Sequence, residues 1–289
     1  MGTMLRNLQS ILSQDNARLT SVLSLDASTA RIEVQALLQH VLKVSRAYLL
    51  AFPERFLNDA EQREYETLFQ RRLHGEPIAY ILGEREFFDL KFKVTPATLI
   101  PRPETELLVE LALLHLPTLS LEKRLRVLDL GTGSGAIALS IAHARPDVEV
   151  VAVDTSNEAL SVAHENAEIL GIKNAVFIFS NWFAVLDRKR FDLIVSNPPY
   201  IASDDAHLHQ GDLRFEPATA LASGYDGLDD IRSIVLDAQK YLEPCGKLLL
   251  EHGYDQAAQV RELMNQAGFR EVFSACDLAG IERVSGGCL

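Results

Sequence analysis

The chain has 289 residues, of which 47% are apolar and 24% charged, and its formal net charge is −12. This length predicts one large domain with a smaller one, and this composition excludes an extensively disordered or fibrous protein. With no bilayer-length apolar run and no signal-peptide pattern, we expect a cytoplasmic protein without a membrane partner. Three scattered cysteines and no clustered metal ligands predict neither a disulfide framework nor a metal site.

The negative charge is concentrated in the second part of the chain. Residues 1–85 carry ten basic and ten acidic side chains, which leaves eighteen basic and thirty acidic side chains for the remainder. Such a surface repels a polyanion over most of its area, although a local basic patch is compatible with this count. We therefore expect no direct nucleic-acid partner.

Residues 1–85 have the apolar spacing of helices, as at Leu8 and Ile11. Asn58 followed by Glu61 is typical of a capping box at the start of a helix. No catalytic cluster is evident in this segment. We predict a small all-α domain here, with a role in packing or substrate recognition.

Residues 86–101 change to strand alternation followed by prolines, which predicts a β-hairpin linker. Residues 102–289 then alternate between strand and helix patterns, which is typical of an α/β domain with a parallel sheet covered by helices on both faces. The predicted strands are 126–130, 148–153, 175–179, 191–195, 247–251, 271–275 and 281–284. The main predicted helices are 105–117, 136–144, 228–242 and 256–267.

A glycine-rich loop, Gly131 to Gly135, follows the first of these strands and begins a helix, where a ligand is expected. Asp154 ends the next strand at a distance suited to ribose hydroxyls. The loop also fits the loose dinucleotide fingerprint, so a nicotinamide enzyme is an alternative. Asp129, expected at the mouth of the loop, would repel a pyrophosphate but attract the ammonium group of S-adenosylmethionine. The charge therefore favours S-adenosyl-L-methionine as cofactor.

Asn197-Pro198-Pro199-Tyr200 closes the apolar run that begins at Phe191. Neither proline has a backbone N–H, so the strand end offers carbonyl oxygens and the Asn197 amide as acceptors, with Tyr200 as a flat surface. Such a site suits a planar NH₂ group. The alternative is a Pro-Pro turn with a capping Asn, and Trp182, after the third strand, is open to interpretation as an adenine contact or a core aromatic.

Three further segments carry a specific resemblance: GEPIAYILG at 75–83, IPRPETE at 100–106 and RFEPATAL at 214–221. With the glycine loop and Asn-Pro-Pro-Tyr, the chain resembles the PrmC/HemK family of release factor glutamine methyltransferases over nearly its whole length. This resemblance implies an N-terminal helical domain, a hairpin linker and a seven-stranded Rossmann-like methyltransferase domain. It implies methyl transfer to the glutamine N5 of the Gly-Gly-Gln motif in class I peptide chain release factors, which tunes translation termination.

The resemblance also implies the roles of individual residues. The cofactor contacts would be Gly131, Thr132, Gly133, Ser134, Gly135, Asp154, Trp182 and Asn197. The glutamine contacts would be Asn197, Pro198, Pro199 and Tyr200, with Asn197, Pro198 and Tyr200 catalytic. Asn181 departs from the Asp that many relatives have before the aromatic, which puts cofactor affinity in question. Glu104, Glu106 and Glu216 are interpreted as structural or substrate-orienting.

Two alternatives remain open from the sequence. An adenine N6 or guanine N2 methyltransferase can share the Asn-Pro-Pro-Tyr site and stack a flipped base on Tyr200. A non-catalytic adaptor that binds an adenosyl ligand would keep the glycine loop without transferring a methyl group. The acidic charge argues against a nucleic-acid methyltransferase, and the intact acceptor site argues against an adaptor. We expect a monomeric enzyme.

Overall fold

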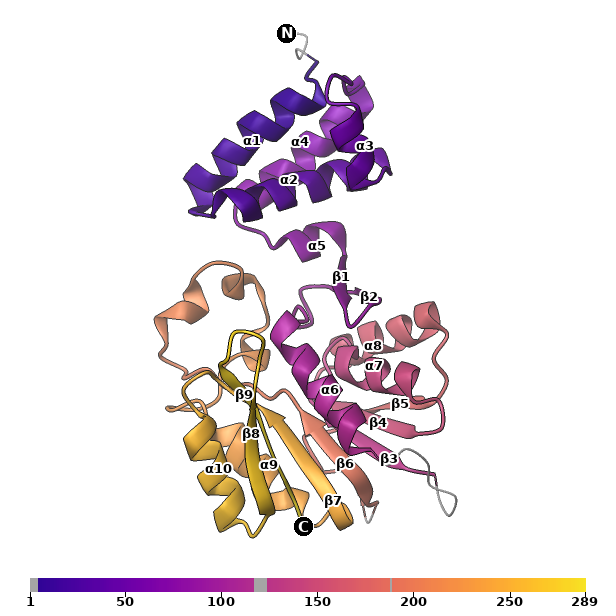
Figure 1. Cartoon of the computed structure of the whole chain (residues 1–289), viewed down its shortest axis with the longest axis vertical. Coiled ribbons are helices and arrows are strands. Elements are labelled where there is room, and N and C mark those ends of the chain that lie inside the picture. Colours follow the sequence, from indigo (N-terminus) through magenta and orange to yellow (C-terminus); the bar gives the residue numbers. More distant parts are fainter. Residues whose placement is uncertain (1–4, 117–123, 188) are drawn as a thin grey trace. The chain divides into compact units, whose positions relative to one another are not determined.

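The computed structural model describes residues 5–116, 124–187 and 189–289 of the chain (Figure 1). The chain divides into two compact units, Met1–Gly83 and Glu84–Leu289. The hairpin expected as a linker over 86–101 lies in the second unit, and its first strand begins at Glu84. Within the described ranges, no helix combines the length and the apolar character needed to cross a membrane.

The first unit is a group of helices around one apolar core. The helices are α1 (Leu8–Leu23), α2 (Ala27–Leu42), α3 (Arg46–Ala51), α4 (Asp59–Leu73) and α5 (Ile78–Leu82). Leu37 and Leu38 of α2 are completely buried in this core. At the start of α4, Asn58 and Glu61 form both hydrogen bonds of the predicted capping box, which satisfies N–H groups that have no partner within the helix.

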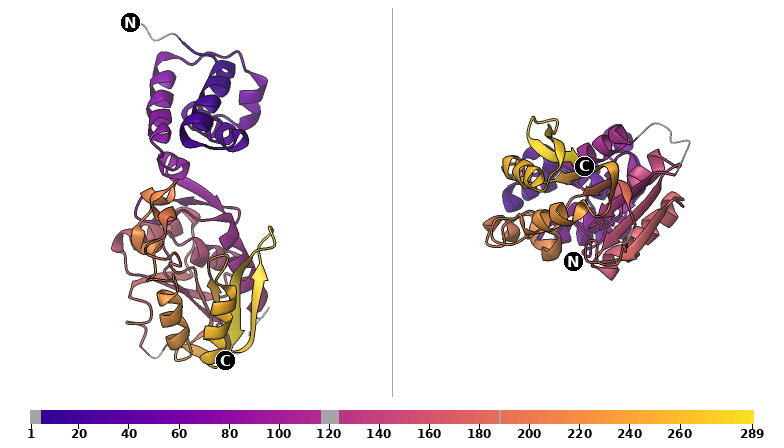
Figure 2. Two further views of the ribbon diagram at one scale, coloured as in Figure 1. Left: turned by 90° about the vertical axis from the view of Figure 1, so that its left-hand side faces the viewer. Right: turned by 90° about the horizontal axis from the view of Figure 1, so that it is seen from below.

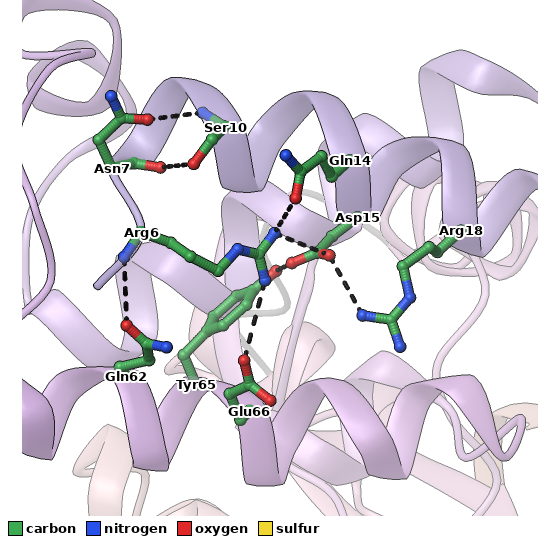
Figure 3. Close-up of polar contacts among 9 residues, drawn as sticks. All are labelled: Arg6, Asn7, Ser10, Gln14, Asp15, Arg18, Gln62, Tyr65 and Glu66. Carbon is green, nitrogen blue, oxygen red and sulfur yellow. Dashed lines mark hydrogen bonds and ion pairs between the residues drawn. The ribbon is translucent and has the colours of Figure 1, made fainter. Parts of the chain in front are cut away.

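A buried polar cluster joins α1 to α4 (Figure 3). Asp15 is completely buried, and its Oδ2 accepts a hydrogen bond of 2.9 Å from the Tyr65 hydroxyl. Its Oδ1 lies 3.0 Å from Arg6 and 3.4 Å from Arg18. Burial raises the pKa of Tyr65, and the charge of Asp15 raises it further. We call Arg6, Asp15, Arg18 and Tyr65 the Asp15 cluster, in which both oxygens of a buried carboxylate have partners.

The second unit contains a seven-stranded sheet in the order β5-β4-β3-β6-β7-β9-β8. Its strands are β3 (Arg126–Leu130), β4 (Glu149–Asp154), β5 (Ala175–Phe179), β6 (Phe191–Ser196), β7 (Leu242–Glu251), β8 (Arg270–Cys276) and β9 (Glu282–Cys288). The predicted seven-stranded α/β fold is confirmed, but the expectation of a wholly parallel sheet was wrong. β9 pairs antiparallel with both β7 and β8, because a short turn joins β8 to β9 without a crossover helix. This pair forms the yellow edge of the sheet in Figure 2.

Helices cover both faces of the sheet. Val127 and Leu193 face the side of α6 (Glu106–His115), α7 (Ala136–Ala144) and α8 (Asn157–Leu170). Leu128 and Ile194 face the side of α9 (Asp229–Ala238) and α10 (Ala257–Gln266). These alternating apolar residues explain why the strands are apolar along their whole length.

One predicted helix end differs from the structure. The helix predicted over 228–242 ends at Ala238, because Leu242 already pairs with Phe191 as the first residue of β7. Tyr241 and Leu242 continue the apolar spacing of the helix, so periodicity alone does not show the change. The predicted end of α6 at Pro117 lies outside the described residues.

The hairpin consists of β1 (Glu84–Phe87) and β2 (Leu90–Lys93). Its turn residues Phe88 and Asp89 have φ values of 49° and 59°, as in the two-residue turns whose twist matches paired strands. The Glu106 carboxylate accepts a 3.0 Å hydrogen bond from Phe88 N and so ties this turn to α6. Short 3₁₀ helices follow at η1 (Pro103–Thr105), η2 (Ala206–His209), η3 (Leu213–Phe215) and η4 (Ala218–Ala220).

Candidate active site

A cavity of about 500 Å³ lies at the carboxyl ends of the parallel strands of the second unit. Gly131 and Gly133 line it after β3, Asp154 at the end of β4, Trp182 after β5 and Asn197 after β6. This is the edge of an α/β sheet where ligands bind, since neighbouring strand ends bring their loops together. The remaining walls come from two connecting segments, around 97–99 and 217–220.

The glycine loop has the backbone shape that the sequence predicts. Gly131 has a φ of 73°, in the left-handed region that favours glycine, and a Cβ there would lie 3.4 Å from the Trp182 ring. Gly135, with φ of 82°, precedes α7, and a Cβ there would lie 3.0 Å from a Leu139 methyl carbon. The loop is therefore shaped both to approach a ligand and to pack closely against its own helix.

Asp129 is not at the mouth of the loop, and this expectation was wrong. The side chain is completely buried, and its Oδ2 accepts a 2.6 Å hydrogen bond from the Thr132 hydroxyl. Burial raises the pKa of this carboxyl to about 7, opposed by the Thr132 hydrogen bond. Asp129 thus stabilises the glycine loop through Thr132 and does not line the cavity. Its charge therefore does not favour one cofactor over another.

Asp154 joins the glycine loop to the wall of the cavity. Its Oδ2 accepts a hydrogen bond of 2.8 Å from Gly133 N, and its Oδ1 accepts one of 2.9 Å from Ser156 N. Each carboxylate oxygen keeps acceptor capacity for a ligand hydroxyl. Trp182 lines the same cavity, where its ring packs over Gly131, so it serves as both packing and cavity wall.

Asn197 lines both this cavity and a smaller one of about 50 Å³, which is also lined by Pro198 and Tyr200. Its Nδ2 donates a hydrogen bond of 3.2 Å to the Oγ1 of Thr105, a buried residue at the end of η1. Among the described residues, none donates a hydrogen bond to Asn197 Oδ1. The amide oxygen is therefore the atom left for a ligand.

Glu251, at the end of β7, lies behind this group and is 2% exposed. Burial raises the pKa of its carboxyl to about 7, and the nearby hydroxyls of Thr105 and Tyr200 and the charge of Arg283 act against this shift. Burial also raises the pKa of Tyr200, so its hydroxyl stays protonated and able to donate. We call Asn197, Thr105, Glu251 and Tyr200 the Glu251 cluster.

Glu216 connects the two segments that complete the large cavity. Its buried carboxylate accepts a 3.0 Å hydrogen bond from Ile100 N and forms an ion pair with Arg102. Burial raises the pKa of Glu216, against the opposing effect of Arg102. Since Leu99 and Pro217 on either side line the cavity, this contact holds two of its walls together.

The predicted site residues divide into those that line a cavity and those that support it. Thr132 and Ser134 are buried, and neither they nor Gly135 line either cavity, whereas all the other predicted contacts do. Sequence reasoning missed Thr105, Glu251 and Asn166. Asn166 of α8 donates hydrogen bonds to Ser134 O and Lys93 O, which fixes the glycine loop against the hairpin. For Glu251, the available signal was a charged residue directly after an apolar run, as at Asp154.

A seven-stranded sheet with a glycine loop and a carboxylate on adjacent strand ends places the second unit among the Rossmann-like methyltransferases. Residues 121–279 match the model described as a methyltransferase domain, and residues 17–83 match the PrmC N-terminal domain. The crystal structure of a methyltransferase from Pyrococcus furiosus has the same fold, with a TM-score of 0.52 at 19% identity over 76% of this chain and 96% of that chain.

Close relatives give the family. The chain is 48% identical over 262 residues to the release factor glutamine methyltransferase of Salmonella typhimurium, covering 91% of this chain and 93% of the relative. It is 52% identical over 279 residues to that of Burkholderia pseudomallei, covering 94% and 95%. The chain belongs to the release factor glutamine methyltransferase family, and the predicted family is confirmed.

S-adenosylmethionine fits the large cavity. A volume of about 500 Å³ is in the range of sites for cofactor-sized ligands. The cavity combines glycine backbone at Gly131, a carboxylate at Asp154 and an aromatic side chain at Trp182, groups whose chemistry suits an adenosyl ligand. The protein is a methyltransferase that uses S-adenosylmethionine, and the nicotinamide alternative does not apply.

Proposed function

We propose that this chain transfers a methyl group to the side-chain N5 of the glutamine in the Gly-Gly-Gln motif of class I peptide chain release factors. The observation that carries the proposal is the Asn197 amide, which lines both cavities and is held through Nδ2 by Thr105, so that Oδ1 is the atom of this amide without a donor among the described residues. The large cavity would hold the cofactor, and the small one would admit a slender side chain that ends in an amide.

The residues act on a nucleophile that is weak because its lone pair is delocalised into the carbonyl. When bound, S-adenosylmethionine supplies a methyl group on a positively charged sulfonium. Asn197 Oδ1 and the Pro198 carbonyl accept the two amide hydrogens, which weakens the conjugation and orients the nitrogen lone pair. Tyr200 packs on the amide plane, and Pro199 lines the cofactor side. As the new C–N bond forms, the methyl–sulfur bond of the sulfonium would break and leave a neutral thioether. The acidified nitrogen would then lose one proton to solvent or a carbonyl acceptor, so no strong general base is needed.

We further propose that the helical region, residues 1–85, recognises the protein substrate. A glutamine side chain alone offers too little surface to distinguish one protein from another. Contacts remote from the reacting amide raise selectivity, because they are absent for other glutamines. Removing residues 1–83 should leave S-adenosylmethionine binding nearly unchanged but greatly reduce transfer to an intact release factor. Circular dichroism must first show that the remaining unit is folded; undiminished transfer would contradict this role.

The same proposal describes a monomeric cytoplasmic enzyme without a direct nucleic-acid partner, in keeping with a net charge of −12. Labelled methyl transfer to purified release factor, ribosomes and DNA, assayed side by side, tests it. We expect label in the release factor alone. Label mainly in DNA or RNA would instead support the amino-methyltransferase alternative, and cofactor binding without any transfer would support an adaptor.

A further inference from the structure

The backbone of the Asn-Pro-Pro-Tyr segment is held by a glutamine from another part of the chain. Neither Pro198 nor Pro199 has a backbone N–H, so these residues cannot be fixed through donors of their own. The carbonyl of Tyr200, which directly follows them, accepts a hydrogen bond of 3.0 Å from Gln256 Nε2. Gln256 lies 56 residues later, directly before α10, and is 7% exposed. A buried amide thus binds the end of a segment that lines the small cavity.

Both ends of the Gln256 amide bind backbone groups. Its Oε1 accepts a hydrogen bond of 2.8 Å from Gly253 N, in the loop after β7. Because this donor binds the amide oxygen, the NH₂ end is the one that faces Tyr200 O. Nε2 also donates a longer hydrogen bond of 3.4 Å to the carbonyl of Asp226, close to the start of α9. One side chain therefore joins the segments after β6, before α9 and after β7.

Gly227 limits the position of the same carbonyl. It has a φ of 76°, and a Cβ there would lie 2.2 Å from Tyr200 O and 2.8 Å from Gln256 Nε2. Both distances are much shorter than an ordinary van der Waals contact, so a larger residue would displace the Tyr200 backbone. The Tyr200 carbonyl is therefore confined between a hydrogen-bond donor and a glycine.

The place of this contact gives it a role in the reaction. Pro198 and Tyr200 line the small cavity, where the substrate amide is proposed to bind. A movement of their backbone changes the distance from the amide nitrogen to the methyl group, and the rate of an in-line displacement depends steeply on that distance. We propose that Gln256 is a positioning residue that holds the Tyr200 carbonyl and so keeps the Asn-Pro-Pro-Tyr segment in its reactive geometry. This inference rests on the proposed amide transfer.

Two variants disturb the Tyr200 carbonyl from its two sides. Gln256→Met keeps the length of the side chain but removes its hydrogen bonds, and kcat for the release factor should fall about tenfold. Gly227→Ala forces the Tyr200 backbone to move by about 1 Å, and kcat should fall about a hundredfold. In both variants, the KM for the release factor and the dissociation constant for S-adenosylmethionine should change less than about threefold, because contacts remote from the amide determine them.

Each variant has a matched control. Asn174→Leu also removes a side-chain amide that binds backbone carbonyls, three of them between 142 and 148, but Asn174 directly precedes β5, at the opposite edge of the sheet from the cavities. Gly224→Ala introduces a Cβ at a φ of 65°, where it would meet the exposed Asp229 carboxylate and not the Tyr200 backbone. Both controls should keep kcat within about twofold, even where the free energy of unfolding falls.

NMR tests the contact without the reaction. The sequence contains two Tyr-Ile pairs, Tyr200-Ile201 and Tyr80-Ile81, so protein labelled with ¹³C-carbonyl tyrosine and ¹⁵N isoleucine gives two carbonyl–nitrogen signals. The carbonyl frequency depends on the hydrogen bond that the oxygen accepts. The Tyr200 signal should therefore shift in Gln256→Met and Gly227→Ala and stay in place in the two controls. The Tyr80 signal, from α5 in the first unit, should stay in place in all four variants.

The two measurements separate the possible outcomes once circular dichroism shows which variants are folded. An unshifted Tyr200 signal in Gln256→Met would contradict the contact. A shifted signal together with a kcat close to that of the unmodified enzyme in both Gln256→Met and Gly227→Ala would overturn the positioning role. If only one of these two variants folds, it decides alone. If the unmodified enzyme methylates no release factor, the proposed function fails, and the Tyr200 signal still decides whether Gln256 holds this carbonyl.

Discussion

The two units each bury a carboxylate beside a tyrosine hydroxyl, but they compensate its charge differently. In the Asp15 cluster, Arg6 and Arg18 pair with one oxygen while Tyr65 donates to the other. In the Glu251 cluster, the groups that lower the pKa of the carboxyl are the nearby hydroxyls of Thr105 and Tyr200 and the charge of Arg283, and one oxygen has no hydrogen-bond partner among the described residues. The first arrangement stabilises a helix pair; the second leaves a carboxyl able to change its protonation near neutral pH, which suits a catalytic site.

The largest expected effect is on the active-site side of this comparison. Asn197→Ala should lower kcat about a hundredfold or more, because it removes one of two acceptors that activate the amide. The free energy of unfolding and the dissociation constant for S-adenosylmethionine should change little. Steady-state methyl transfer, calorimetric titration and denaturant unfolding measure the three quantities; near-normal turnover would refute the acceptor role of Asn197.

The corresponding change in the Asp15 cluster should affect stability and not the intrinsic rate. Asp15→Asn removes the charge that pairs with Arg6, and the free energy of unfolding should fall by about 2 kcal/mol. Asp59→Asn, an exposed acid on α4, is the matched control and should change it by less than about 0.5 kcal/mol. If Asp15→Asn were as stable as the control, the ion pairs of Figure 3 would contribute nothing measurable.

Asp154 tests the cofactor side of the site. Asp154→Ala removes a charged acceptor and also frees Gly133 N and Ser156 N, so the dissociation constant for S-adenosylmethionine should rise about tenfold or more. Glu149→Gln, at the opposite end of the same strand, should leave it unchanged. Isothermal titration calorimetry measures the dissociation constant of each variant. Equal affinities in the two variants would show that Asp154 does not contribute to the cofactor site.

The smallest effects come from the two tyrosines and sharpen the comparison most. Tyr65→Phe should lower the free energy of unfolding by about 1 kcal/mol, since Asp15 loses one neutral donor but keeps its arginines. Tyr200→Phe removes a hydroxyl near Glu251 that lowers the pKa of its carboxyl. The pKa of Glu251 should therefore rise in this variant. NMR titration of the Glu251 carboxyl carbon measures it, and an identical pKa in Tyr200→Phe and the unmodified enzyme would show that Tyr200 does not influence Glu251.

Sequence patterns predicted the parts of this protein that depend on local chemistry. The strands around Asp154 and Asn197, the capping box at Asn58 and the conformation of the glycine loop follow from residues close together in the chain. The burial of a side chain and its partners far away in the chain do not follow from local sequence patterns. The pattern around Asp129 is the same whether the side chain points into the cavity or beneath the loop, and only the packed sheet shows that it is buried. Thr105 at the end of η1 holds Asn197, which lies 92 residues later in the chain, and no local spacing encodes this contact.

The central claim is that Asn197 presents an acceptor to one particular substrate amide. The most direct measurement is tandem mass spectrometry of a class I release factor after incubation with S-adenosylmethionine and either the unmodified enzyme or Asn197→Ala. The account predicts a single added methyl group on the side-chain nitrogen of the Gly-Gly-Gln glutamine with the unmodified enzyme and almost none with the variant. Methylation of another residue, or equal modification by both proteins, would contradict it.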